Sequence, residues 1–197
     1  VPNWPTSTTQ VGDQLRTLLL TFGATVNAQP TGDTQTITAQ SNGAINGVDL
    51  HVPEAGELAP TLVGLAALAA HGTGTGDGVA SRITGIGHIR HHETDRIAAL
   101  VAEINKLGGK AEELEDGITV HPATLHGGTW GAYADHRMAT TGAVIGLRIA
   151  GVSVDDVEST SKTLPEFVKL WEGLASGNPV QVHRTHADHI SNILDRA

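Results

Sequence analysis

The stretch Arg90-His91-His92-Glu93-Thr94-Asp95-Arg96 stands directly before apolar residues at helical spacing, at positions 97, 100, 101 and 104. This order places a charged loop at the N-terminus of a predicted helix, where unpaired N–H groups and a partial positive charge favour anions. Arg96 adds a planar guanidinium that suits carboxylate or phosphate, and Glu93 and His92 can transfer protons. A solvated first turn has a similar composition, because acidic residues are common there. The stretch alone therefore indicates either an anion site or the exposed start of a surface helix.

A polar loop followed by an amphipathic helix occurs three times, with the loops beginning at positions 9, 92 and 161. The first two helices are predicted to end at Gly23 and at Gly108, because glycine commonly follows the last helical turn. Each is followed by a predicted β-hairpin, with turns at Gly32-Asp33 and Asp116-Gly117. The repeated order indicates one structural unit used more than once.

A second kind of helix, almost wholly apolar and rich in small residues, is predicted over 58–70 and 137–149. Each of these helices should be buried, and each precedes a β-like run, at 79–83 and 152–157. Corresponding points recur after roughly 70–85 residues, a length that fits a βαβαββ unit and exceeds that of solenoid repeats. We therefore predict an α/β domain of repeated βαβαββ units over 1–176, the first lacking its opening part. Residues 177–197 are predicted to be a tail with a short helix.

The bulk composition excludes several classes of protein. Hydrophobic residues make up 39% and charged residues 17%, as in ordinary globular domains. The net charge of −9 argues against a nucleic-acid or membrane surface. The absence of cysteine removes disulfides and fits a reducing compartment, and the longest apolar runs are too short to span a membrane. We therefore expect a cytoplasmic protein.

The first residue is Val1, and the only methionine is Met138. From this we expect a processed chain or a fragment of a longer one.

No metal is expected. His183, His186 and His189 are spaced by three residues, but on a helix they would fan over about 120°, and no acid or cysteine completes a ligand set.

Two further segments place ionisable residues at the starts of the buried helices. Glu57 precedes the first, and Tyr133-Ala134-Asp135-His136-Arg137-Met138 opens the second. A first-turn carboxylate can simply complement the helix dipole. Asp, His and Arg before an apolar helix, however, are unfavourable unless they pair or bind a ligand. Lys162, in Thr160-Ser161-Lys162-Thr163, would alone be a surface lysine, but it occupies the position that Glu93 and Arg96 occupy one unit earlier.

Together, the His92–Arg96 stretch and the segments around Arg137 and Lys162 resemble the 5-enolpyruvylshikimate-3-phosphate synthase family, from about Trp4 to Leu174. Gly56-Glu57-Leu58 with His92 is similar to actinobacterial members, whereas the commoner pattern has Asp and Lys there. The resemblance implies a two-domain enolpyruvyl transferase fold. Each domain has three βαβαββ units in pseudo-threefold symmetry, and helix N-termini of both domains point into the substrate cleft. This chain would be most of one domain, and the N-terminal half of the enzyme would be its partner.

The resemblance also implies an activity in the shikimate pathway of aromatic amino-acid and chorismate biosynthesis. The enolpyruvyl group of phosphoenolpyruvate is transferred to the 5-hydroxyl of shikimate 3-phosphate, and phosphate is released without a cofactor. Glu57 would take the hydroxyl proton, and Glu93 would serve the C3 carbon of phosphoenolpyruvate. The remaining implied substrate-binding residues are Arg96, Arg137 and Lys162 for phosphoenolpyruvate, and His92, His88 and again Glu57 for shikimate 3-phosphate. Asp135 and His136 would orient Arg137 and line the substrate pocket. The chain by itself is expected to be inactive.

Two other functions remain open from the sequence. The sister family that transfers enolpyruvyl to UDP-N-acetylglucosamine shares the fold, but it typically relies on a cysteine and lacks the Glu-Thr-Asp-Arg and Ser-Lys-Thr segments. A non-catalytic domain that binds phosphorylated ligands weakly is the other alternative.

Overall fold

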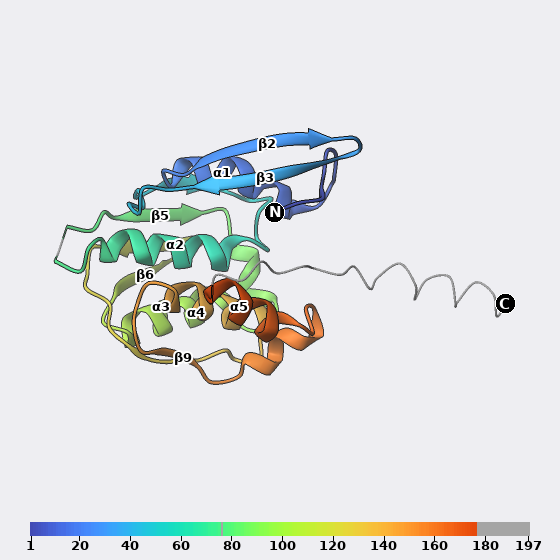
Figure 1. Ribbon diagram of the computed structural model, residues 1–197. Coiled ribbons are helices and arrows are strands. Elements are labelled where there is room, and N and C mark those ends of the chain that lie inside the picture. The colour runs from blue at the N-terminus through green and yellow to red at the C-terminus, as the bar shows by residue number, and fades with distance from the viewer. Residues whose placement is uncertain (76, 177–197) are drawn as a thin grey trace, which may run out of the picture.

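The computed structural model describes residues 1–75 and 77–176 of the 197-residue chain. It is an α/β structure with three small sheets and five α-helices in this part of the chain (Figure 1). The predicted tail, 177–197, and its three histidines lie outside the described residues. Within the described ranges, no helix combines the length and the apolarity needed to cross a membrane.

The middle of the chain forms one complete βαβαββ unit, which confirms the predicted repeat. Its sheet has the strand order β4-β5-β7-β6, in which β4 and β5 are parallel and the other pairs are antiparallel. The predicted hairpin between β6 and β7 is present, but its turn is Glu115-Asp116, one residue earlier than expected, because Leu114 already pairs with Gly117. The elements are β4 (Asp49–His51), α2 (Ala59–His71), β5 (Ser81–Thr84), the 3₁₀ helix η2 (Gly87–His91), α3 (Arg96–Lys106), β6 (Lys110–Leu114) and β7 (Gly117–His121). The short opening strand β4 was not identified from the sequence.

The elements on either side of this unit match its closing and opening parts. Before it come a helix and a hairpin, with one added strand, in a sheet of order β1-β3-β2. Their bounds are β1 (Trp4–Pro5), η1 (Val11–Gln14), α1 (Leu15–Thr21), β2 (Thr25–Thr31) and β3 (Thr34–Gln40). After it come two parallel strands and two helices, namely β8 (Gly128–Trp130), α4 (His136–Gly146), β9 (Val152–Val154), η3 (Val157–Lys162) and α5 (Phe167–Ala175). That residues 1–176 form most of one domain remains a prediction.

The core is built around α2, which runs through the middle of the molecule and packs on α4, β5 and β7 (Figure 1). Ten of its residues are buried, as expected of a helix that is apolar on all sides. Gly64 of α2 and Thr141 of α4 allow the two helices to approach closely, since a Cβ at Gly64 would lie 3.0 Å from Thr141 Cγ2. Because α2 and α4 pack side by side, their N-terminal ends can contribute to one site.

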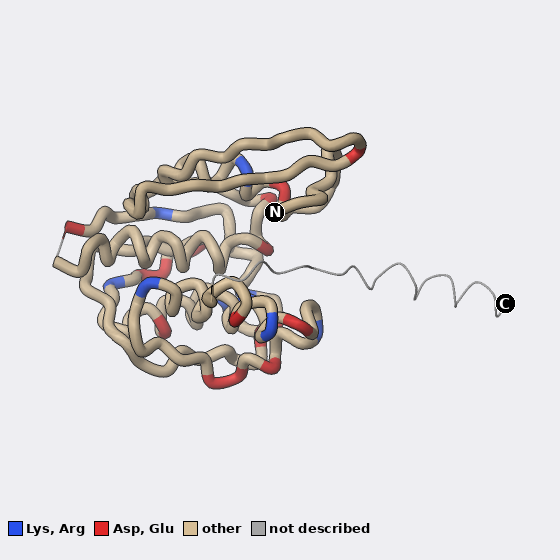
Figure 2. Tube along the Cα trace, in the orientation of Figure 1, with Lys and Arg blue, Asp and Glu red and all other residues tan. Residues whose placement is uncertain are grey.

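Charged side chains are dispersed along this fold. Figure 2 shows Lys and Arg at separated points, interspersed with Asp and Glu, in the described part of the chain. In this view, charges of both signs are mixed over the fold.

The packing of Gly142 on α4 gives a test of the fold. A Cβ there would lie 2.5 Å from Cδ1 of the fully buried Trp130, so Gly142→Ala should destabilise the protein by about 1–3 kcal/mol through overpacking. This loss should occur although alanine favours helix by about 1 kcal/mol over glycine. Urea unfolding measures it. Gly146→Ala on the same helix, where the nearest atom is 3.8 Å away, is the matched control and should not lose stability. Equal stability of the two variants would contradict the packing.

Candidate active site

Most of the predicted site residues lie at or just before the N-terminal ends of α2, α3 and α4, whereas His88 and Lys162 belong to the 3₁₀ helices η2 and η3. Asp95 caps α3, because its carboxylate accepts a hydrogen bond from the N–H of Ala98 at 3.0 Å. Asp135 caps α4 in the same way, through the N–H groups of Arg137 and Met138. Glu57 precedes α2 by two residues and complements the positive end of that helix. The ionisable residues therefore gather where three helix dipoles favour negative charge.

A buried ion pair joins two of these helix ends. Nε of Arg96 donates to Oδ2 of Asp135 at 2.7 Å, and Nη2 donates to Oδ1 at 3.2 Å. Arg96 is 2% exposed and Asp135 is fully buried. Burial alone would raise the pKa of Asp135, but the bonds from Arg96 and from the two backbone N–H groups outweigh it and lower this pKa below its usual value. The pair thus fixes the start of α3 against the start of α4.

Arg96 has N–H groups that remain available to bind a ligand. Three of its five N–H groups are used by Asp135 and by Nδ1 of His92, which is 2.9 Å from Nη1. Since a guanidinium can only donate, Nδ1 of His92 is the acceptor in this contact. The other N–H groups face carboxylates at longer range, Glu57 Oε2 at 3.8 Å from Nη1 and Glu93 Oε2 at 3.9 Å from Nη2.

Glu57 lies among the basic side chains. Its Oε2 is 3.2 Å from Nε of Arg137, and its Oε1 is 3.4 Å from Nδ1 of His92. The contact with Arg137 is a close ion pair without hydrogen-bond alignment, because Arg137 Nε is buried and has no hydrogen-bond partner. Glu57 therefore contacts the guanidinium of Arg137, while Asp135 accepts from the backbone N–H of Arg137 at 2.8 Å. A buried donor without an acceptor in the protein is unfavourable, and a water or a bound ligand would satisfy it.

Glu93 is held on the other side of Arg96. Its Oε2 is 3.1 Å from Nδ1 of His136, the first residue of α4, and Glu93 itself is exposed at the mouth of the site. The carboxylate thus has a possible proton partner and an open side, which is what a group that exchanges protons with a bound molecule needs.

His88 is placed beside His92 and over the backbone before Glu57. The two imidazole rings are 6.0 Å apart, and a Cβ at Gly56 would lie 2.0 Å from Nε2 of His88. Only glycine at position 56 therefore allows the ring to take this position. His88 belongs to the site but makes no direct contact with the arginines.

Lys162 reaches the site from a different local structure than expected. It ends the 3₁₀ helix η3, and α5 begins only at Phe167, so it does not stand directly before an α-helix as predicted. Its Nζ nevertheless donates to the carbonyl oxygen of Ala134 at 3.3 Å, next to Asp135. All nine predicted residues thus belong to one connected group.

Sequence reasoning missed the residues that support the loop before α4. Glu103 is 4% exposed and accepts hydrogen bonds from the N–H of Gly131 at 2.6 Å and the hydroxyl of Tyr133 at 2.9 Å. Asp155 accepts from the N–H of Ala132 at 2.8 Å. A signal for Glu103 was present, because it falls on the same side of α3 as Arg96 and Leu100, which are both buried.

Three possible metal ligands, Glu93, Asp135 and His136, have ligand atoms within 4.8 Å of one another. Asp135 is already bonded to Arg96 and to two backbone N–H groups. A cation would also lie beside the Arg96 guanidinium, and like charges repel strongly at such a distance. The donor set therefore suits an internal ion pair better than a metal.

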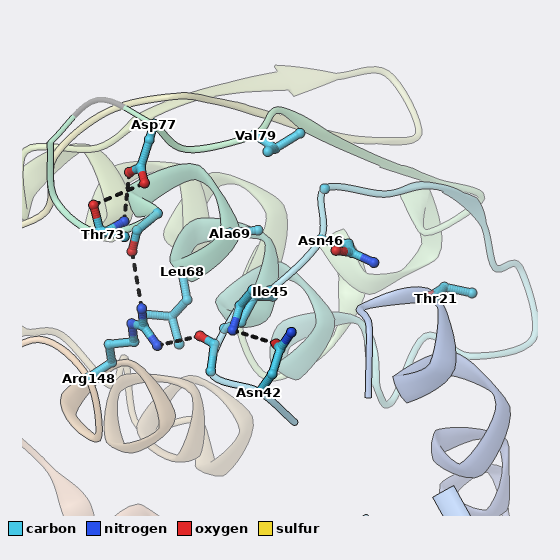
Figure 3. A pocket seen from close by; sticks show the side chains of 14 residues that line it. Thr21, Asn42, Ile45, Asn46, Leu68, Ala69, Thr73, Asp77, Val79 and Arg148 are labelled. Carbon is cyan, nitrogen blue, oxygen red and sulfur yellow. Dashed lines mark hydrogen bonds between the residues drawn. The ribbon is translucent and has the colours of Figure 1, made fainter. Parts of the chain in front are cut away.

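A separate hollow of about 770 Å³ lies at the other end of α2 (Figure 3). Its walls come from the loop 42–47, from Leu68, Ala69 and Gly72 at the end of α2, and from Thr73, Asp77, Val79 and Arg148. Arg148 donates to the carbonyl oxygens of Gly43 and Gly72 and so ties its rim together. The hollow lies roughly 15 Å along the helix axis from Glu57 and contains none of the predicted site residues.

Comparison with known proteins agrees with this geometry. Residues 1–171 match the EPSP synthase (3-phosphoshikimate 1-carboxyvinyltransferase) family, so the chain belongs to that family. It is 48% identical over 174 residues to a 3-phosphoshikimate 1-carboxyvinyltransferase from Kocuria rhizophila, which covers 88% of this chain and 36% of that protein. The chain thus spans about a third of the length of this curated relative.

Solved structures confirm the enolpyruvyl transferase fold. An EPSP synthase from Acinetobacter baumannii superposes with a TM-score of 0.67 at 24% identity, over 87% of this chain and 40% of that one. The enolpyruvyl transferase NikO from Streptomyces tendae superposes with a TM-score of 0.52 at 18% identity, over 78% of this chain and 33% of that one. At this level of identity the likeness concerns the fold alone.

The ion pair between Arg96 and Asp135 should make stability depend on pH. Asp135→Asn should cost about 3–5 kcal/mol at neutral pH, because it leaves a buried guanidinium without its counter-charge. Since the folded-state pKa of Asp135 is lowered, its contribution is complete above the unfolded pKa of about 3.9 and is lost as the pH falls through the lower folded value. Urea unfolding across pH 7 to about 3 should show the two proteins converging below about pH 4.

Asp33→Asn, in the exposed turn of the first hairpin, is the control and should match the unsubstituted protein. A stability difference for Asp135→Asn that stays constant with pH would contradict the assignment.

Proposed function

We propose that this chain forms one part of a 3-phosphoshikimate 1-carboxyvinyltransferase. In this proposal it transfers the enolpyruvyl group of phosphoenolpyruvate to the 5-hydroxyl of shikimate 3-phosphate in the shikimate pathway. The remaining part would correspond to the portion of the Kocuria relative that the chain does not match. A cytoplasmic location is part of the proposal and rests on the sequence alone.

The observation that carries the proposal is the buried, unsatisfied Nε of Arg137 in a group with two other cations. Arg96 and Arg137 lie at the positive ends of α3 and α4, and Lys162, from η3, reaches the loop before α4. Arg96 still has N–H groups available. Phosphoenolpyruvate carries a carboxylate and a phosphate, the two groups that a guanidinium binds in bidentate fashion. We infer that this ligand supplies the acceptor that Arg137 lacks, with Glu57 turning away from the guanidinium.

The two glutamates suit the two centres at which protons move in the reaction, the 5-hydroxyl and C3. The 5-hydroxyl loses a proton as its oxygen bonds to C2 of phosphoenolpyruvate, while C3 gains one. As phosphate leaves, C3 gives up a proton and the double bond is restored. We assign the hydroxyl proton to Glu57, beside His92 and His88. We assign the C3 proton to Glu93, which can exchange it with His136 at 3.1 Å.

The proposal predicts that activity needs the rest of the enzyme. The chain alone should not release phosphate from phosphoenolpyruvate and shikimate 3-phosphate, because it supplies only part of the groups that hold two anionic substrates. A chimera, in which this chain replaces the matching segment of the Kocuria enzyme, should be active in the same assay. Turnover by the isolated chain, or an inactive chimera that folds and binds neither substrate, would contradict the proposal.

Within the chimera, the two glutamates should respond differently to substitution. Glu93→Gln should mainly lower kcat, by about 10²–10⁴-fold for a lost general acid–base group. Glu57→Gln should also weaken shikimate 3-phosphate binding, because it loses a contact made in the ground state. Exchange of solvent deuterium into C3 should fall sharply only in the first variant. Full exchange in Glu93→Gln would show that Glu93 is only a charge at a helix start.

A non-catalytic phospholigand-binding role predicts a different result in the same experiments. The chimera would then bind phosphoenolpyruvate without turnover, and Glu93→Gln would change nothing. Transfer to UDP-N-acetylglucosamine is tested by offering that acceptor in place of shikimate 3-phosphate.

A further inference from the structure

Glu103 lies inside the molecule, behind the site rather than in it. Its carboxylate accepts from the N–H of Gly131 and the hydroxyl of Tyr133, and it forms an ion pair with Lys106 on its own helix. It is seven residues after Arg96, so both side chains leave the same face of α3, toward the loop before α4. With three partners, the buried carboxylate of Glu103 has its hydrogen-bonding capacity filled. In the same way it fixes the positions of Gly131 and Tyr133.

The loop that Glu103 holds has a backbone that needs support. Tyr133 and Ala134 have φ angles of 57° and 53°, two consecutive non-glycine residues in the left-handed region. This conformation is unfavourable for residues with a Cβ and persists only where the surroundings impose it. The bonds from Gly131 and Tyr133 to one carboxylate span the start of this turn. Burial raises the pKa of Tyr133, and so does its bond to Glu103, which keeps the hydroxyl a donor.

The same loop fixes the relative position of the basic residues of the site. The carbonyl oxygen of Ala134 accepts from Lys162 Nζ, and the next residue, Asp135, holds Arg96 and caps α4. A shift of residues 133 and 134 would therefore move Lys162 relative to Arg96 and Arg137. Among the described residues, the partners of His92 are Arg96, Glu57 and the ring of His88, and none of these lies in this loop.

We propose that Glu103 is a positioning residue that aligns Lys162 with Arg96 and Arg137 through the backbone of residues 131–134. The proposal rests on the proposed function for the identity of the ligand. It predicts that loss of Glu103 weakens the binding of phosphoenolpyruvate and leaves that of shikimate 3-phosphate unchanged. A general loss of stability would not discriminate between the two substrates.

The test uses Glu103→Gln in the active chimera. Glutamine has nearly the same size but only one acceptor oxygen, and its NH₂ group would face a donor. We expect the KM for phosphoenolpyruvate to rise on the order of tenfold, as for a lost charge-assisted hydrogen bond. The KM for shikimate 3-phosphate should stay the same. Tyr133→Phe removes one hydrogen bond to Glu103 and keeps its carboxylate, so it should raise the KM for phosphoenolpyruvate by a smaller factor. It serves as the test if Glu103→Gln does not fold.

Asn105→Ala is the matched control on the same helix. Asn105 makes two hydrogen bonds, to the N–H and the carbonyl oxygen of Ala111, and does not touch the loop 131–134. It should lower the melting temperature without changing either KM. An unchanged KM for phosphoenolpyruvate in Glu103→Gln, or equal rises for both substrates, would overturn the proposal.

Hydrogen exchange in the chain itself separates this inference from the proposed function. In Glu103→Gln the amides of residues 131–135 should exchange faster, while those of β6 and β7 keep their protection. Unchanged protection at 131–135 would overturn the positioning role whatever the activity of the chimera. An inactive unsubstituted chimera with faster exchange in the variant would instead overturn the proposed function and the ligand assignment, and would leave Glu103 as the residue that orders the loop.

Discussion

The buried contact between Arg96 and Asp135 is the interaction on which the site depends. It joins the first residue of α3 to the cap of α4 through two hydrogen bonds, in surroundings where neither charge reaches water. A buried ion pair of this kind need not stabilise the fold, because the loss of hydration offsets much of the attraction. Its geometry, however, sets the start of α3 against the start of α4, and this placement puts Glu93, just before α3, beside His136 of α4.

The repeated unit of the fold brings several helix starts to the same region. In the central unit, the buried helix α2 and the amphipathic helix α3 both begin near the site, and α4 begins there from the next unit. Each start contributes backbone N–H groups and charged side chains to the same region. The hydrophobic core is thereby kept along the helices, while the polar groups that would be unfavourable within it gather at one end.

The amino-acid sequence predicted the helices, the two hairpins and the βαβαββ repeat, because hydrophobic periodicity and turn residues are local signals. The nine site residues were assigned through the resemblance to the synthase family, and their roles stay a prediction. Strand β4, with three residues, was too short for such a signal. The 3₁₀ helix before Lys162 was missed because its Ser-Lys-Thr segment resembles an α-helix start. The partner of each charged side chain could not be predicted from the sequence. The carboxylate of Asp135, for example, could have paired with the guanidinium of Arg137, and only the packing of α3 against α4 shows that it pairs with Arg96. Glu103 was overlooked for the same reason, because its partners lie 28 and 30 residues away in the chain.

The most direct measurement is a crystal structure of the chimera with phosphoenolpyruvate and shikimate 3-phosphate bound, using Glu93→Gln to slow turnover. The account predicts that the Arg96–Asp135 pair is unchanged, that Glu57 has left Arg137, and that Arg137 Nε and Lys162 Nζ contact phosphoenolpyruvate. It would be contradicted if phosphoenolpyruvate bound elsewhere while Glu57 remained beside Arg137, or if Asp135 released Arg96 to bind the ligand.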